Sequence, residues 1–526
     1  MVGALKTARN FASGRFDLEF PLGTSSFYGT LRNHTMRTMR RAPARAPEGV
    51  EVIWKRRGVS LRGAATLTAA AWISAASAAP ANLSPGISVK FRPIAQLRSS
   101  APSSTASVAN ATNITTHPAL PSSLAGSVYN NWLTVADSRG RVSLVNASSY
   151  SAGVTNPNRT IVDLRTATQG LNIGNTTSGN SELGLRWFAY HPDFARAGAK
   201  GYLKAYTMSC HATSTRTLTG AAPLYHGVPV GAPQTQPCDN VLTEWRLNAS
   251  TMTASSPRQV MRWPQLYTNH GTDALVFSEI TKLLYVAVGD GGSQGDPHNV
   301  GQNKEYVYGK ILRIDPTLPG TTVPENMVKS WDGRWSHPAD NPYANTSGRN
   351  AIYVLGLRHP ETMIKDGPDL FVFDIGGSAF EEVNFIKMDG DEGRNFGWDR
   401  VEGRSPADST TLPPVAGYPH VNGNRAIIGG AAPDIGPFAG KVILGDIVSG
   451  NVYYGDRNAM KVARAWNIPM VPLQQFVMHN NAGTPQTLMS AFGRNSRVDL
   501  RLTEISGGRV IGVSKQRGIV FEIIPR

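Results

Sequence analysis

The sequence predicts an all-β fold of the β-propeller type. An alternating apolar run at Leu283–Val288 meets a Gly/Asp turn, and a second apolar run follows at Lys310–Asp315, which is typical of antiparallel strands in a meander. Three later segments repeat this order of strand, Gly-containing turn and strand: Asp369–Lys387, Lys441–Asp456 and Arg509–Ile524. The four units begin 68 to 86 residues apart. A four-stranded blade needs about 40 residues, so this spacing suits blades with long loops.

Composition supports a strand-rich fold and argues against a nucleic-acid partner. The 526 residues include 53 Gly and 35 Pro, and only 17% are charged, which favours turns and strands over helices. The formal net charge is +15, but residues 1–62 hold 12 Lys/Arg and 4 Asp/Glu, so +8 lies there and +7 is spread over the other 464 residues. The basic excess therefore belongs mainly to the N-terminal extension.

Residues 1–80 are interpreted as a targeting extension. Arg56-Arg57 and Arg62 precede an Ala-rich apolar run at Ala64–Ala79 that ends in small residues, which is the pattern of a secretory signal peptide. We therefore expect a secreted or extracellular protein. Organelle targeting and an uncleaved signal anchor in a membrane are the alternatives.

The rest of the chain is predicted to be a linker and one domain. Residues 81–125 are dominated by Ser, Ala, Pro and Thr, which predicts a disordered linker. The globular domain is expected to occupy residues 126–526, with its ring closed by strands from both ends of the domain.

Two features favour an oxidising compartment. Eight sequons predict a glycoprotein: Asn82, Asn110, Asn113, Asn146, Asn158, Asn175, Asn248 and Asn345. The two cysteines, Cys210 and Cys238, bracket a Gly/Pro/Thr-rich loop between strand-like segments, so a disulfide there would close a hairpin. Two unpaired thiols are the alternative.

Six segments of the chain occur in the order seen in one protein family. The longest runs from the GDGG turn at Gly289 to Asp315, and the others are Glu182–Phe194, Asn269–Asp290, Ala339–Pro360, Glu381–Ile386 and Asn395–Trp398. Over roughly residues 127–526 the chain resembles the soluble quinoprotein glucose/sorbosone dehydrogenases. The resemblance implies a six-bladed β-propeller that holds pyrroloquinoline quinone (PQQ) and calcium over its central channel.

The resemblance also implies an activity and a base. The expected reaction oxidises the hydroxyl of a sugar or sugar derivative, a lactol or an alcohol, by hydride transfer to the quinone, and an electron acceptor then takes the electrons. His270 matches the family's base, and an imidazole suits proton uptake near neutral pH. Arg358 matches an arginine that faces the cofactor, where a guanidinium stabilises negative charge on the reduced quinone.

Further residues are implied as contacts of the cofactor and the metal. Asn269, His359 and Arg425 are expected beside PQQ. The backbone carbonyls of Gly376 and Gly377 are expected on calcium, which takes oxygen ligands. A separate oxygen-rich loop holds Asp290, Asp296 and Asn299, which we interpret as turn-stabilising residues.

Five positions depart from the family pattern. Leu183 stands where the glucose dehydrogenases have Gln, Thr272-Asp273 where Gly-Gly is usual, His359 where Asn is usual, and Gly377 where Pro is usual. Loss of cofactor contacts would suit an alternative: a noncatalytic extracellular propeller that binds a protein or glycan, as hedgehog-interacting proteins do. A calcium-dependent hydrolase is a third hypothesis, but the sequence shows no convergent set of Asp, Asn and Glu ligands for it.

Overall fold

The computed structural model describes two units of the chain, Met1–Ala81 and Asn82–Arg526. It describes residues 85–97, 111–148, 150–151, 156, 158–165 and 182–526, except 346–347, 422–424, 481, 495–496 and 516; of residues 1–84 it describes only the backbone of four short strands. These strands, β1 (Phe16–Leu18), β2 (Phe27–Gly29), β3 (Trp54–Arg56) and β4 (Val59–Leu61), form one antiparallel sheet. The signal-like run Ala64–Ala79 lies outside the described residues. Within the described part, no helix has the length and apolar character needed to cross a bilayer.

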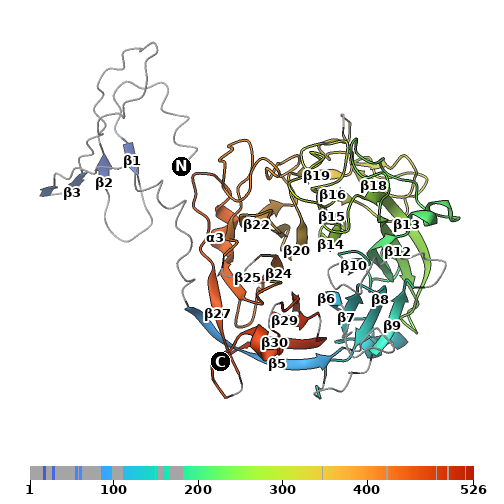
Figure 1. Cartoon of the computed structure of the whole chain (residues 1–526), viewed down its shortest axis with the longest axis horizontal. Helices are drawn as coiled ribbons and strands as arrows, with labels where there is room; N and C mark the ends of the chain where they lie inside the picture. The colour runs from blue at the N-terminus through green and yellow to red at the C-terminus, as the bar shows by residue number, and fades with distance from the viewer. Residues whose placement is uncertain are drawn as a thin grey trace, which may run out of the picture. The chain divides into compact units, whose positions relative to one another are not determined.

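The second unit is a six-bladed β-propeller (Figure 1). The first three blades consist of β6 (Ala111–Thr116), β7 (Leu133–Asp137), β8 (Arg141–Val145) and β9 (Asn158–Asp163); β10 (Leu185–Tyr190), β11 (Lys204–His211), β12 (Cys238–Leu247) and β13 (Ala254–Gln265); and β14 (Thr272–Phe277), β15 (Leu284–Val288), β16 (Lys310–Ile314) and β19 (Ile352–Leu355). The fourth and fifth are β20 (Pro360–Asp366), β21 (Asp369–Asp374), β22 (Phe380–Lys387) and β23 (Ala416–Pro419); and β24 (Ile427–Ala431), β25 (Lys441–Asp446), β26 (Val452–Asp456) and β27 (Gln474–His479). The sixth combines β28 (Leu500–Ile505), β29 (Arg509–Ser514) and β30 (Ile519–Pro525) with β5 (Pro85–Gln96).

The first strand of each blade lies at the centre of the ring. β6, β10, β14, β20, β24 and β28 contact one another in turn, and β28 contacts β6 to close the circle. A hairpin of β17 (Met327–Lys329) and β18 (Ser336–Pro338) extends the loop between β16 and β19. Short helices, α3 (Arg457–Val462) and α4 (Leu488–Ala491), flank β27 in sequence. The strand pairs predicted from alternation, around residues 283, 369, 441 and 509, are confirmed as β15–β16, β21–β22, β25–β26 and β29–β30.

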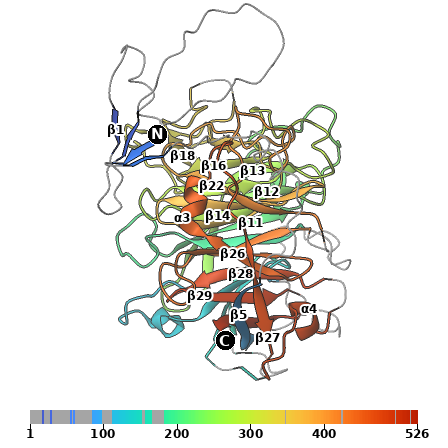
Figure 2. The same cartoon turned by 90° about the vertical axis from the view of Figure 1, so that its left-hand side faces the viewer.

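Strand β5 closes the ring from the N-terminal side. It pairs antiparallel with β30, from Val89 opposite Pro525 to Gln96 opposite Ile519, and parallel with β27 (Figures 1 and 2). The linker predicted for residues 81–125 is therefore wrong, since this range contains β5 and β6, and the propeller begins at Pro85 instead of residue 126. The Ser/Ala/Pro-rich composition hid both strands because their order comes from pairing with distant segments, while closure by both ends of the domain occurs as expected.

The predicted disulfide is present. Cys210, at the end of β11, is bonded to Cys238, at the start of β12, across 28 residues and with the Cα atoms 5.7 Å apart. The two cysteines form a buried apolar cluster with Leu183. The bridge therefore holds the base of the long β11–β12 loop.

Removal of this disulfide is expected to destabilise the propeller. Replacing both cysteines by Ser should lower the free energy of unfolding by about 3 kcal/mol, since a cross-link over a loop of this length restricts the unfolded chain. Urea denaturation of the variant and of wild type with dithiothreitol checks this, and both should show the same loss. A variant as stable as the oxidised wild type would contradict the prediction.

The predicted sequons differ in accessibility. Asn158 and Asn248 are exposed, as is Asn345, whereas Asn113 is buried in β6 and its side-chain oxygen accepts a hydrogen bond from the Phe188 amide. Asn113 is therefore not a glycan site in the folded protein. Asn82, Asn110 and Asn175 lie outside the described residues.

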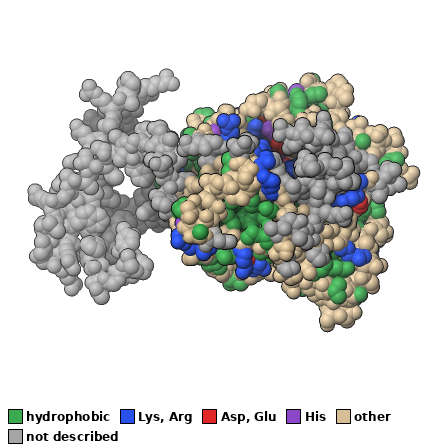
Figure 3. All heavy atoms as spheres, turned by 60° about the horizontal axis from the view of Figure 1, so that its bottom comes forward, with side chains coloured by type: hydrophobic (Ala, Val, Ile, Leu, Met, Phe, Trp, Pro, Cys, Tyr) green, Lys and Arg blue, Asp and Glu red, His purple; other side chains and the backbone are tan. Residues whose placement is uncertain are grey.

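On the face shown in Figure 3, Lys and Arg side chains lie in separate groups around an apolar area, not in one continuous patch.

Candidate active site

One cavity lies where the chain enters the central strands. Its volume is about 670 Å³, within the range of small-molecule sites. It is lined by residues just before the first strands of five blades: Glu182, His270, Arg358, Arg425 and Arg497. Six of the seven site residues predicted from the sequence line this cavity, namely His270, Arg358, His359, Gly376, Gly377 and Arg425. The seventh, Asn269, does not, because its side-chain oxygen accepts a hydrogen bond from the Ser293 amide, away from the lining.

His270 is held in one orientation by a buried carboxylate. Its Nδ1 lies 2.7 Å from Asp290 Oδ1, and its backbone N–H donates to Glu182 Oε2 at 2.6 Å. A carboxylate only accepts hydrogen bonds, so Nδ1 carries the proton. Nε2 has no hydrogen-bond partner among the described residues and is free to accept a proton in the cavity. His270 also has φ of +48°, an uncommon backbone state for this residue type that often marks functional sites.

Asp290 does more than the turn-stabilising role expected for it. It accepts a hydrogen bond from the Gly292 amide at 3.0 Å, as a turn residue does, but it also receives the Trp398 indole N–H at 3.0 Å and orients His270. Asp290 lies two residues after β15, and His270 lies two residues before β14, with which β15 pairs, so both residues lie at the same end of their blade. Strand pairing in the GDGG segment is the sequence signal that could have found this dyad.

Arg358 presents a partly unsatisfied guanidinium. One Nη donates to the Ile375 carbonyl at 3.0 Å, and the group lies over the Trp398 ring, 5.5 Å from its centroid. Its Nε is buried without a hydrogen-bond partner in the described part of the chain. An unpaired buried donor is costly, so the arrangement favours an anionic or carbonyl ligand beside it.

A buried carboxylate accepts hydrogen bonds from the backbone around Arg358. Asp374 accepts the amides of Arg358 and His359 at 2.9 and 2.6 Å, and it lies opposite Glu382 in the β21–β22 register. Burial raises the pKa of Asp374 despite these two amides, and burial together with the nearby Asp374 charge raises the pKa of Glu382. The two acids thus resist carrying two negative charges at neutral pH.

Further cations line the side of the cavity formed by the last two blades. Arg425, Arg497 and Lys515 lie there, and only Arg425 was predicted. Burial, with the nearby Arg501 and Arg186 charges, lowers the pKa of Lys515 to about 8. No described residue accepts a hydrogen bond from its ammonium. Arg497 is ion-paired with Asp499, so Lys515 is the cation on this side whose ammonium is best placed to bind an anion.

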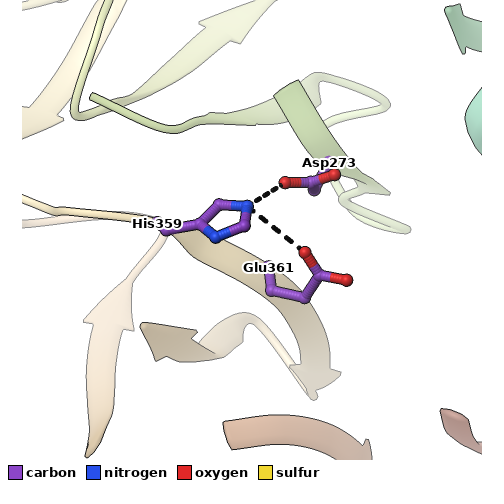
Figure 4. A group of neighbouring side chains, drawn as sticks. All are labelled: Asp273, His359 and Glu361. Carbon is purple, nitrogen blue, oxygen red and sulfur yellow. Dashed lines mark hydrogen bonds and ion pairs between the residues drawn. The ribbon is translucent and has the colours of Figure 1, made fainter. Parts of the chain in front are cut away.

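An ion-pair network centred on His359, Asp273 and Glu361 (Figure 4) lies beside the cavity, and His359 and Glu361 line it. His359 Nε2 lies 2.5 Å from Asp273 Oδ2 and 3.3 Å from Glu361 Oε2. Arg186 pairs with both carboxylates, and Arg501 lies 3.2 Å from Glu361. Arg186 lies in β10, Asp273 in β14, Glu361 in β20 and Arg501 in β28, and His359 directly precedes β20. The network therefore joins four blades across the channel.

Charge balance argues against a metal in this network. Asp273, His359 and Glu361 are close enough to hold an ion. However, Arg186 and Arg501 already neutralise the carboxylates. Burial works to raise the pKa of Asp273, but the Arg186 and His359 charges lower it well below its usual range.

The loop predicted to bind calcium is folded around an internal carboxylate. Glu402 Oε1 accepts the amides of residues 377 to 380 at 2.7 to 3.1 Å. Gly376 is sterically required, since a Cβ there would lie 1.7 Å from the Phe380 carbonyl. The Gly377 carbonyl accepts a hydrogen bond from Gln294 at 3.2 Å, which a cation would have to displace. Calcium binding at this loop stays a prediction.

Comparisons with known proteins place the fold. No protein-family model matches the chain. It is 29% identical over 306 residues to the HIPL2 protein and 27% identical over 317 residues to the HIPL1 protein, both of Arabidopsis thaliana. These matches cover 51% and 52% of this chain but only 42% and 44% of the relatives, so the chain matches less than half of either.

Solved structures align over most of the propeller. The soluble aldose sugar dehydrogenase of Escherichia coli, in the apo form, matches with a TM-score of 0.53 at 15% identity, over 84% of this chain and 100% of that one. A glucose dehydrogenase-type oxidoreductase of Thermus thermophilus matches with a TM-score of 0.50 at 17% identity, over 83% and 100%. The chain has the sugar-dehydrogenase fold. A PQQ-bound aldose sugar dehydrogenase of Streptomyces coelicolor matches with a TM-score of 0.49 at 18% identity, over 84% and 99%.

The residues at the positions that depart from the dehydrogenase pattern differ in their locations and contacts. Leu183 packs on the disulfide and does not line the cavity, so no polar group replaces the usual Gln there. Asp273 and His359 bond to each other. Gly377 remains at the cavity edge. His270, Arg358 and Arg425 thus line the cavity, and the Asp273–His359 pair lies beside it.

Proposed function

We propose that this propeller is a PQQ-dependent dehydrogenase that oxidises the hydroxyl of a sugar or sugar derivative. The single observation that carries the proposal is the His270–Asp290 pair, whose His270 lines a cavity that also contains Arg358, Arg425 and Lys515. The sugar-dehydrogenase fold supports it, but fold alone does not establish activity.

The donor set of the cavity fits PQQ. Its carboxylates and quinone oxygens suit the unpartnered Arg358 Nε, the Lys515 ammonium and the guanidinium of Arg425. When bound, PQQ would supply the two-electron acceptor for a hydride. Arg358 would stabilise the negative charge that develops as the acceptor is reduced.

The residues of the chain would move the proton. His270 Nε2 would take the proton of the substrate hydroxyl while the adjacent carbon loses hydride, so the substrate becomes a carbonyl compound. Asp290 would hold the ring through Nδ1–H and stabilise the imidazolium that forms. The proton would then leave His270 to water, and an external electron acceptor would be needed to take up the two electrons.

Turnover over a panel of sugars tests the activity. The full chain with PQQ and Ca²⁺ is expected to reduce a redox dye in the presence of an aldose or a polyol, and it should not do so without PQQ. Binding of PQQ without turnover on any sugar would contradict the dehydrogenase proposal. Absence of PQQ binding would instead favour the noncatalytic binding module, for which the loss of a polar residue at Leu183 is the supporting observation.

Calcium removal is expected to weaken cofactor binding. If the carbonyls of Gly376 and Gly377 share an ion with PQQ, chelation by EGTA should lower PQQ affinity at least about tenfold, because EGTA removes the ion whose oxygen ligands would come from both PQQ and the protein. Calorimetric titration with and without EGTA, followed by Ca²⁺ repletion, checks this. Equal affinity in both would remove calcium from the proposed site.

A further inference from the structure

Two departures from the dehydrogenase pattern are partners in this structure. Asp273 and His359 are 86 residues apart in sequence, and their side chains meet at 2.5 Å inside the propeller. Both are buried, with 2% of each side chain exposed. A Gly and an Asn at these positions could not form this ion pair, so the two changes act as one unit.

One nitrogen of His359 remains unused by the protein. Nε2 faces Asp273 and Glu361, while Nδ1 points away from both carboxylates (Figure 4). Nδ1 has no hydrogen-bond partner among the described residues. His359 lines the cavity, and its ring stacks on that of His270 with centroids 4.9 Å apart. An additional donor thus lies beside the base.

We propose that Asp273 holds His359 as an imidazolium, and that this cation donates its Nδ1–H to an oxygen of the anionic ligand in the cavity. The identification of that ligand as PQQ rests on the proposed function. Asn at this position would offer a neutral donor only, whereas a charged donor forms a shorter and stronger hydrogen bond. Ligand affinity is consequently coupled to the charge of His359.

The surroundings of His359 explain why it stays charged. Burial by itself lowers its pKa, but the negative charges of Glu182 and Asp273, the hydrogen bond to Asp273 and the charge of Glu361 outweigh burial and raise the pKa to about 9. The charged and titratable groups around it, from every packed element, are Glu182, Arg186, His270, Asp273, Arg358, Glu361, Asp374 and Arg501.

The sign of the pH effect follows from the raised pKa. The pKa in the folded protein lies above the ordinary histidine value of 6.5. The charge of His359 is therefore present at neutral pH and is lost as pH rises through about 9. Lys515 lines the same cavity with a pKa of about 8, so its own deprotonation must be separated from that of His359.

The test measures PQQ binding to the full chain by calorimetry between pH 6 and 10, in a Lys515→Met background. Affinity is expected to fall about tenfold through pH 9, the scale of one charge-assisted hydrogen bond. His359→Asn should bind about tenfold more weakly at pH 7 and lack the step. Asp273→Asn should move the step to lower pH, because burial then dominates. Thermal melts verify that each variant is folded.

A second readout needs no cofactor. In ¹³C-histidine-labelled full chain, the His359 ring signal is identified by its absence in His359→Asn, and it should titrate near pH 9 in wild type and lower in Asp273→Asn. Titration of this signal below pH 7 in wild type would overturn the inference. So would a His359→Asn variant that keeps both the affinity and the pH step.

A third probe separates this inference from the proposed function. If PQQ fails to bind, pyridine-2,6-dicarboxylate serves as a smaller aromatic anion. Binding of this anion with a step that depends on His359 would uphold the inference while the dehydrogenase proposal fails. Absence of any such binding, with PQQ also unbound, would overturn both.

Discussion

Replacement of His270 by Gln is expected to lower kcat by about 10²- to 10⁴-fold, which is the usual effect of losing a general base. Gln keeps a donor near Asp290 but accepts no proton at neutral pH. Because the effect belongs to the chemical step, KM and PQQ affinity should change only a few-fold. Dye-reduction kinetics at saturating PQQ measure both parameters.

His298→Ala is the matched control for this variant. His298 stacks on Tyr267 and does not line the cavity, so its replacement should leave kcat within about twofold of wild type. A His270→Gln enzyme with near-wild-type kcat would remove His270 from the proposed role, even if PQQ binds normally.

The second large effect concerns the closure of the ring. A fragment of residues 126–526 lacks β5 and β6. It should fail to fold, because β27 and β30 lose their shared partner and the first blade loses its central strand. Exposed strand edges of this kind also promote aggregation.

A fragment of residues 82–526 is the matched control, since it contains every propeller strand. It should be monomeric and melt cooperatively, whereas the shorter fragment should be insoluble or lack a melting transition. Circular dichroism and size-exclusion chromatography distinguish the two. A cooperative melt of 126–526 at the same temperature would show that β5 is dispensable.

Local sequence signals were sufficient for the strands that pair with their neighbours. Runs such as Leu283–Val288 are short and apolar and end in glycine turns, so their hairpins could be predicted without tertiary information. β5 has apolar residues at alternate positions, Ile87, Val89 and Phe91, but its partners are strands near the other end of the chain. The Ser/Ala/Pro-rich composition therefore led to the wrong prediction of a linker for β5, because the strands that pair with β5 are distant in sequence.

Some residues of the candidate site could likewise be predicted from local motifs, whereas others come together only in the folded ring. His270 and Arg358 lie in contiguous motifs that resemble a family, and both line the cavity. Arg186 and Glu361 were not predicted, because they are 175 residues apart in sequence and meet only when the central strands form the ring. Lys515 gave no signal either, since one lysine near the chain terminus is indistinguishable from a solvent-exposed one.

Binding of PQQ by the cations of the cavity is tested most directly by calorimetric titration of the full chain with PQQ in the presence of Ca²⁺. We expect one PQQ per chain, with affinity lowered at least about tenfold in Arg358→Ala because a charged hydrogen-bond partner is lost. The absence of binding heat at high micromolar PQQ, or equal affinity in wild type and Arg358→Ala, would contradict it.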